Sequence, residues 1–111
     1  MKTNDGLWVV EFGSSLGLFG RGVMILNGQR ILGGDVGYYY SGNCKVDDDR
    51  INGKINVIRF DQNSISVFGD IDSFILTFNG TIDGSDIIAS ATSDSFVNLE
   101  MTIKASKRED M

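Results

Sequence analysis

Residues 27–49 constrain the fold more than any other segment of this chain. The segment begins with Asn27-Gly28 between two apolar runs. This dipeptide is a strong hairpin signal, because a type I′ turn needs positive φ at both of its central residues. A short apolar run then reaches Gly33-Gly34, where a closing sheet can bend. An aromatic run from Tyr38 follows, and aspartates at 47–49 turn the chain again. Together these features indicate antiparallel β architecture.

Apolar and polar residues also alternate along the rest of the chain, with the period of two that is typical of strands with one buried face. No window shows the 3.6-residue period of a helix, so we expect little helix. A longer connection is expected at 61–71. The pattern predicts eight strands, at 7–12, 19–26, 29–34, 38–46 and 50–60, and around 74–78, 87–91 and 97–103.

The 111 residues suit a single domain. The expected connections are nearly all local, which favours a meandering barrel over a Greek-key sandwich with its long crossings. We therefore predict an all-β fold, a single eight-stranded antiparallel barrel formed by about residues 5–104. Residues 105–111 are expected to form a charged, solvated tail. A barrel of eight strands has an interior that side chains can fill or that holds one small ligand.

Composition removes several kinds of chemistry. The chain has no histidine and one cysteine, so it can assemble neither a structural zinc site nor an intrachain disulfide. Asp47-x-Asp49 begins like a calcium-binding EF-hand loop, but Ile51 and Ile58 occupy later ligand positions. We expect no metal and no cofactor. Cys44 is expected to be an inert buried thiol, because no cation is placed to lower its pKa.

Charge and hydropathy bear on partners and location. The net charge of −5 and the pI near 4.5 argue against a nucleic-acid surface, which needs clustered Lys and Arg. The first residues lack the apolar run of a secretory signal, and no run approaches the length of a membrane span. The expected location is the cytoplasm, with no membrane or nucleic acid as a partner.

Short elements follow one another in a characteristic order along nearly the whole chain. The elements are Gly6-Leu7-Trp8 with Phe12, Gly20-Arg21-Gly22-Val23, Gly28 with Arg30-Ile31-Leu32-Gly33-Gly34-Asp35, the strand Tyr38–Gly42, Phe68-Gly69-Asp70, and Phe74, Leu76, Phe78, Gly80 and Asp83-Gly84. In this order they resemble the GrlR-like family, small bacterial regulators named for a negative regulator of type III secretion.

The resemblance implies a lipocalin-like barrel that forms a homodimer and has no catalytic activity. In the founding type it implies a protein that binds and restrains a transcriptional activator through four consecutive acidic residues on its surface. The matching stretch here begins with Val46, so only Asp47, Asp48 and Asp49 can be carried over. The resemblance therefore implies a non-enzymatic regulator that binds a protein partner, such as a transcriptional activator, through these three aspartates.

The acidic turn also has a reading that does not depend on the resemblance. Three adjacent carboxylates can meet a basic protein face, and such charge complementarity raises association rate and specificity. Aspartate is equally common in turns because its side chain bonds nearby backbone amides. The residues alone leave both interpretations open.

The predicted inward aromatic residues suggest a second function, a carrier or sensor that takes a small apolar molecule or lipid into the barrel. The same residues can simply fill the core, since protein interiors are closely packed. Buried tyrosine hydroxyls need partners, which favours a pocket with some polar lining. The candidate cavity residues are Trp8, Phe12, Tyr38, Tyr40, Phe74 and Phe78.

Three further groups of residues suggest other functions or contacts. Scattered carboxylates could form a catalytic pair, but nothing in their spacing places them in one cleft, and we expect no enzyme. Gly17-x-x-Gly20-x-Gly22 resembles a phosphate loop in glycine content only, because no helix is expected after it. The scattered carboxylates are Glu11, Asp35, Asp70 and Asp72. The expected dimer surface, an exposed strand face or barrel edge, consists of Ile58, Phe60, Ile65, Val67 and Phe68.

Overall fold

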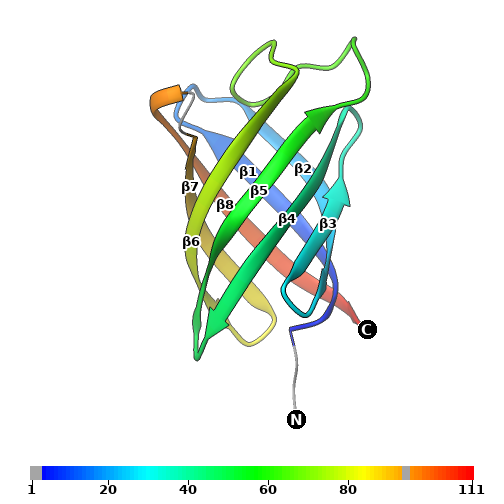
Figure 1. Cartoon of the computed structure of the whole chain (residues 1–111), viewed down its shortest axis with the longest axis vertical. Coiled ribbons are helices and arrows are strands. Elements are labelled where there is room, and N and C mark those ends of the chain that lie inside the picture. The colour runs from blue at the N-terminus through cyan, green and yellow to red at the C-terminus, as the bar shows by residue number, and fades with distance from the viewer. Residues whose placement is uncertain (1–3, 94–95) are drawn as a thin grey trace.

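Eight antiparallel strands wind in sequence order into a closed barrel, with β8 paired to β1 (Figure 1). The computed structural model describes residues 4–93 and 96–111. The fold confirms the prediction of a single all-β meander barrel. The strands are β1 (Gly6–Ser14), β2 (Phe19–Asn27), β3 (Arg30–Gly34), β4 (Tyr38–Asp47), β5 (Arg50–Arg59), β6 (Ser73–Asp83), β7 (Asp86–Ser93) and β8 (Phe96–Asp110).

The strand faces follow the predicted alternation. On β4, Tyr38, Gly42 and Cys44 are buried and Tyr40 is half-buried. On β7, buried Ile87 is followed by exposed Ile88, which shows how strictly the period of two sets the face. The buried apolar core of the described residues is Trp8, Val10, Leu26, Ile31, Tyr38, Cys44, Ile51, Val57, Val67, Phe68, Phe74, Leu76, Phe78, Ile87, Ala89, Ala91, Met101, Ile103 and Ala105.

The expected charged tail is wrong for residues 105–110, which belong to β8. Their backbone pairs with the first half of β1, where Gly6 lies opposite Asp110 and Val10 opposite Ala105. Ala105 is buried, and the Lys107 ammonium lies 2.7 Å from the Asp110 carboxylate. The charged side chains do not end the strand, because barrel closure requires a hydrogen-bonded partner along all of β1.

Hairpin turns of two residues join β2 to β3, β4 to β5 and β6 to β7. Asn27 pairs with Arg30, so the two turn residues between β2 and β3 are Gly28 and Gln29. The turn therefore lies one residue later in the chain than the predicted Asn27-Gly28. Positive φ occurs only at the first turn residue, at 63° for Gly28, 57° for Asp48 and 62° for Gly84. A type I′ turn needs positive φ at both central residues, so the β2–β3 turn is not of the expected type I′. Glycine occupies the first turn position in two of the three turns.

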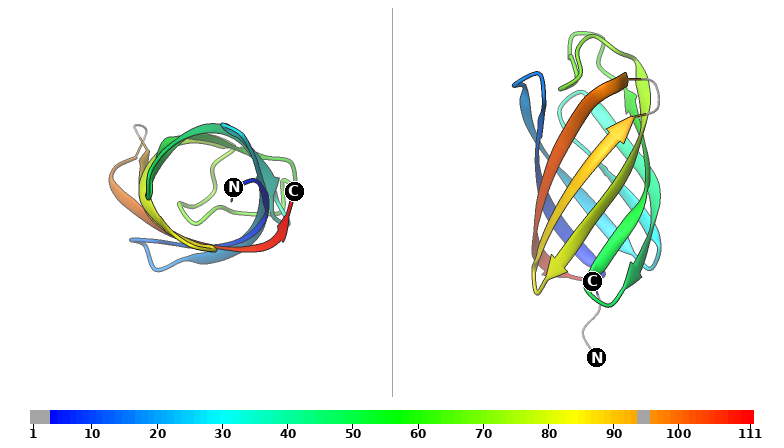
Figure 2. Two further views of the ribbon diagram at one scale, coloured as in Figure 1. Left: turned by 90° about the horizontal axis from the view of Figure 1, so that it is seen from below. Right: turned by 90° about the vertical axis from the view of Figure 1, so that its left-hand side faces the viewer.

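The barrel has two different ends (Figures 1 and 2). One end carries the three tight turns and the C-terminus. Trp8 is fully buried in the core, and its indole N–H donates to the Asn4 carbonyl oxygen at 3.0 Å. The other end carries the β1–β2 and β3–β4 connections and the long β5–β6 connection. Among the described residues, no helix has the length and apolar character needed to cross a membrane.

Candidate functional site: a cavity beneath the β5–β6 loop

The β5–β6 loop, residues 60–72, folds over one end of the barrel (Figures 1 and 2). Its middle section carries Val67 and Phe68, which are buried, and the Phe68 ring lies 5.3 Å from the Phe74 ring. Ser14 at the end of β1 donates its hydroxyl proton to the Val67 carbonyl oxygen at 2.5 Å. Because β1 lies far from β5 in the sheet order, this bond ties the loop across the opening.

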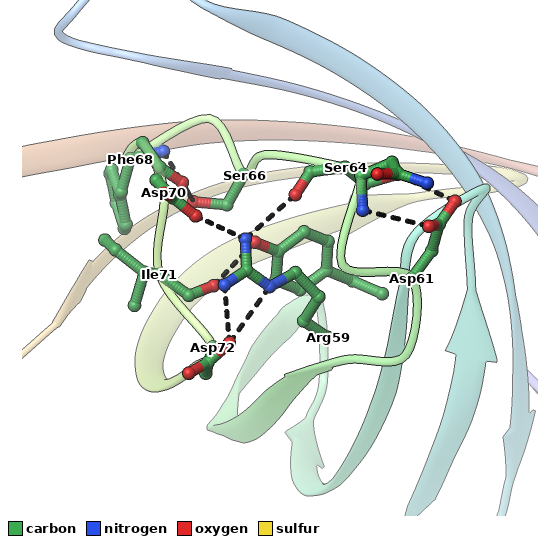
Figure 3. A network of polar contacts seen from close by, with 11 residues as sticks. Arg59, Asp61, Ser64, Ser66, Phe68, Asp70, Ile71 and Asp72 are labelled. Atoms are coloured by element: carbon green, nitrogen blue, oxygen red, sulfur yellow. Dashed lines mark hydrogen bonds and ion pairs between the residues drawn. The ribbon is translucent and has the colours of Figure 1, made fainter.

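Arg59, the last residue of β5, holds both ends of this loop (Figure 3). Its guanidinium donates to Asp70 Oδ1 at 2.5 Å, to Asp72 Oδ1 at 2.5 and 3.1 Å, and to the Ser64 carbonyl oxygen at 3.0 Å. Hydrogen bonds to Asp70 and then Asp72 raise the pKa of Arg59. The Arg59 side chain is 7% exposed although both carboxylates are largely exposed, so the cation is enclosed by its own partners.

A cavity of about 390 Å³ lies inside the barrel under this loop. The lining includes side chains that are strongly exposed, Phe19 at 83%, Val36 at 87% and Ile65 at 64%, and these mark its mouth. The lining residues are Val10, Phe12, Leu18, Phe19, Gly20, Arg21, Met24, Ile31, Asp35, Val36, Gly37, Tyr38, Tyr40, Ile55, Val57, Ser64, Ile65, Ser66, Val67, Phe74, Leu76, Met101 and Ile103.

One polar pair stands out in this mostly apolar lining. Asp35 Oδ1 accepts the backbone N–H groups of Gly37 and Tyr38, each at 2.9 Å, and Asp35 Oδ2 accepts the hydroxyl proton of Tyr40. Burial raises the pKa of Tyr40, and the hydrogen bond to Asp35 and its negative charge raise it further. The Tyr40 hydroxyl therefore stays protonated and donates to Asp35.

Two glycines of β2 make room for this wall of the cavity. A Cβ atom on Gly22 would lie 2.9 Å from the Tyr40 hydroxyl oxygen and 2.7 Å from the Gly34 carbonyl oxygen. A Cβ atom on Gly20 would lie 2.5 Å from the ring of Phe12, which packs edge-on against Tyr40 at 6.3 Å between ring centres. These glycines provide space for aromatic rings within a strand; they are not part of a phosphate-binding loop.

Of the six predicted cavity residues, four line the cavity: Phe12, Tyr38, Tyr40 and Phe74. Trp8 and Phe78 are buried but do not line it, so their assignment to the cavity is corrected. Phe78 lies opposite Gly53, which has no side chain, and Ala91, which has a small one, and both leave space for its ring. Both residues fill the part of the barrel beyond the cavity.

Sequence reasoning missed the contribution of the loops. Ser64, Ile65, Ser66 and Val67 come from the β5–β6 loop, which the period of two could only mark as a connection. Val67 and Phe68, which the sequence placed on an exposed dimer surface, are buried within this loop, and their burial corrects that expectation. The signal that could have shown this is the adjacent apolar pair Val67-Phe68, because two large apolar side chains are unusual in a fully solvated connection.

The acidic turn lies at the opposite end of the barrel from the cavity. Asp47, Asp48 and Asp49 are all exposed. The neighbouring β6–β7 turn is flanked by Asp83 and Asp86, and the Ile82 N–H donates to the Asp49 carbonyl oxygen at 2.7 Å, which holds the two turns together. The turns therefore present five exposed carboxylates on one end of the molecule.

The other candidate carboxylates and Cys44 make separate contacts in the structure. Asp70 and Asp72 bind Arg59, and Asp35 is engaged by Tyr40 and two backbone amides. Glu11 lies on the outer surface, with its carboxylate 3.8 Å from Arg21. Cys44 is buried, and burial followed by the charge of Asp5 raises its pKa. No metal-binding group of three or more Cys, Asp or Glu residues occurs in the part of the chain that the structure describes.

The structure is a closed eight-stranded barrel with a cavity beneath one loop. The interior of such a barrel is either filled by side chains or holds one small molecule. The sequence matches no protein-family model and no curated protein. The resemblance to the GrlR-like family therefore stays a prediction.

Proposed function

We propose that this protein is a non-enzymatic carrier or sensor that binds one small, mainly apolar molecule inside its barrel. The observation that carries the proposal is the cavity of about 390 Å³ beneath the β5–β6 loop. Its volume lies within the range of roughly 300–1,000 Å³ that small-molecule sites occupy, and such sites are lined mainly by apolar side chains with a few polar groups. Phe12, Met24 and Phe74 supply apolar lining, whereas Asp35 and Tyr40 supply polar lining.

Filling the cavity from β2 tests this proposal. Met24 lines the cavity and is half-buried, whereas the next residue, Ile25, is on the outer face of the same strand. The large side chain in Met24→Trp should occupy ligand space and weaken binding about tenfold or more, because the ligand loses apolar contact area. The matched control Ile25→Trp should bind like the wild type. Binding is measured by fluorescence titration with N-phenyl-1-naphthylamine.

Native mass spectrometry of the freshly purified protein adds an independent measurement. The proposal expects an adduct of small-molecule mass that organic extraction removes. If the wild type neither carries such an adduct nor binds the fluorescent probe, the cavity has no ligand function. Equal probe affinity in the wild type and Met24→Trp would place the probe outside the barrel and contradict the proposal.

A second candidate is the regulator that the family resemblance implies, which would bind a protein partner, such as a transcriptional activator, as a homodimer. The observation that favours it is the exposed acidic end formed by Asp47, Asp48, Asp49, Asp83 and Asp86. A surface of one sign attracts a basic partner and raises the rate of association. The two functions use opposite ends of the barrel and are compatible in one molecule.

The acidic end is tested by separating its charge from its turn geometry. Changing Asp47, Asp48 and Asp49 together to Asn removes three charges but keeps side chains that suit the turn. The control is Asp47→Glu with Asp49→Glu, which keeps the charge and leaves Asp48 at its positive φ. In pull-downs from the host at rising salt, the Asn variant should lose the salt-sensitive partners that the Glu variant retains. If both variants capture the same partners, the aspartates serve only the turn.

A further inference from the structure

We infer that the cavity takes an amphipathic molecule whose polar end is a hydrogen-bond donor, with an amino group bound most tightly, a hydroxyl group less tightly and a carboxylate least. This inference rests on the proposed function. It names the chemical class of the ligand from the directions of the hydrogen bonds that the lining already makes. An ionised carboxylate has no proton to donate, and a phenol whose O–H already donates to a protein acceptor can offer a ligand only its oxygen lone pairs.

The protons of the lining hydroxyl groups are committed to protein acceptors. Tyr38 donates to the Ile71 carbonyl oxygen at 2.6 Å, Ser66 to the Gly69 carbonyl oxygen at 2.9 Å, and Tyr40 to Asp35. Ser64 lies within 3.5 Å of Asp61 Oδ2. A carboxylate ligand needs donors, and to obtain one from these hydroxyl groups it would have to break one of these bonds.

Acceptor capacity, in contrast, remains at the pair of Asp35 and Tyr40. Asp35 Oδ2 receives one hydrogen bond, and a carboxylate oxygen has two lone pairs. The Tyr40 oxygen gives its proton to Asp35 and keeps its own lone pairs. A ligand ammonium can therefore donate to both oxygens, and its positive charge is attracted to the Asp35 carboxylate.

Among the residues that the structure describes, no cation forms an ion pair with this carboxylate. The charged residues in the described part of the lining are Arg21 and Asp35. The Arg21 side chain is 81% exposed and points toward Glu11 on the outer face of β1, with 3.8 Å between Nε and Oε1. The electrostatic potential at the pair of Asp35 and Tyr40 is therefore negative, because the Asp35 carboxylate dominates it.

The polar pair also lies at a suitable depth. Asp35 follows β3 and is next to Val36, one of the exposed residues of the mouth. Met24, Leu76 and Met101 supply apolar surface elsewhere in the lining. An amphipathic molecule can place its donor group at Asp35 near the mouth while its hydrocarbon part lies against this apolar surface, so no charged end has to be buried without a partner.

The experiment compares three ligands that share one tail. Octylamine, 1-octanol and octanoate compete against N-phenyl-1-naphthylamine at neutral pH and 150 mM salt. We expect octylamine to bind about tenfold or more tightly than octanoate, with octanol between them, because a charge-assisted hydrogen bond is roughly twice as strong as a neutral one. The wild type alone gives this ranking, so the test does not depend on the folding of any variant.

Two variants locate the preference. Asp35→Asn keeps an oxygen for the Gly37 and Tyr38 amides but removes the charge, and the amine preference should fall to about threefold or less. Glu109→Gln makes the equivalent change on β8 at the opposite end of the barrel, where Glu109 is exposed, and should preserve the wild-type ranking. If both variants change the ranking equally, general surface charge is responsible and the inference is overturned.

The remaining outcomes separate this inference from the proposed function. Equal competition by the three ligands, or tightest binding of octanoate, overturns the head-group assignment while the cavity remains a ligand site. Failure of the probe and of all three ligands to bind the wild type overturns the proposed function, and this inference falls with it.

Discussion

Replacing Trp8 by alanine should lower the free energy of unfolding by about 3–5 kcal/mol, which is the usual cost of truncating a large buried aromatic side chain. Trp8 has no exposed surface, and its indole N–H is bonded to the Asn4 carbonyl oxygen. The substitution removes apolar contacts, leaves a cavity in the core and deprives the Asn4 carbonyl oxygen of its donor. A domain of this size has roughly 5–15 kcal/mol of stability in total, so the variant should be close to unfolding.

Urea unfolding followed by far-UV circular dichroism measures this effect without depending on tryptophan fluorescence. Phe19→Ala is the matched control, because Phe19 is also a strand aromatic but is 83% exposed. Its midpoint should move little. A loss below about 1 kcal/mol in the Trp8 variant would show that Trp8 is not part of a closely packed core.

Replacing Arg59 by methionine should release the β5–β6 loop. Arg59 joins Asp70, Asp72 and the Ser64 carbonyl oxygen, and without its charge the two carboxylates face each other with no cation between them. Local opening should rise on the order of 100-fold, because several charge-assisted hydrogen bonds are lost together. Hydrogen exchange of the Ser66 and Gly69 amides, which bond each other's carbonyl oxygens, reports this opening directly.

The control for the loop is Arg21→Met. Arg21 is largely exposed and has one ion pair at 3.8 Å, so its loss should leave loop exchange unchanged. High salt should also speed opening in the wild type, because Asp70 and Asp72 are accessible to counterions. Unchanged exchange at Ser66 and Gly69 in the Arg59 variant would mean that the bonds from Ser14 and Tyr38 hold the loop without it.

The order of strands and their inward faces could be predicted because both depend on local signals. Each strand alternates with period two, and most neighbours are joined by turns whose residues mark them. The exact turn was harder to predict, because Asn27-Gly28 suits one register and Gly28-Gln29 the next, and cross-strand pairing decides between them. The end of β8 depends on its pairing with β1, and the charged composition of residues 105–110 gave no sign of it.

The candidate site was predicted only where strands form it. Phe12, Tyr38, Tyr40 and Phe74 lie in strands with a period of two, so their inward direction followed from the sequence. The loop side of the cavity depends on contacts between distant residues, such as Ser14 with Val67, which no local pattern encodes. Asp35 could be recognised as a carboxylate after a glycine corner, but its contact with Tyr40 requires the barrel to close.

The junction between β1 and β8 has a consequence for how the chain reaches its native state. The other pairs of neighbouring strands are joined by a turn or loop, so their hydrogen bonds can form outward from that connection. Gly6 and Asp110 pair although nearly the full length of the chain separates them. The entropy of closing so long a loop makes this seam a late step in folding. Until it forms, two unpaired strand edges stay accessible to other molecules, so aggregation competes with folding at that stage.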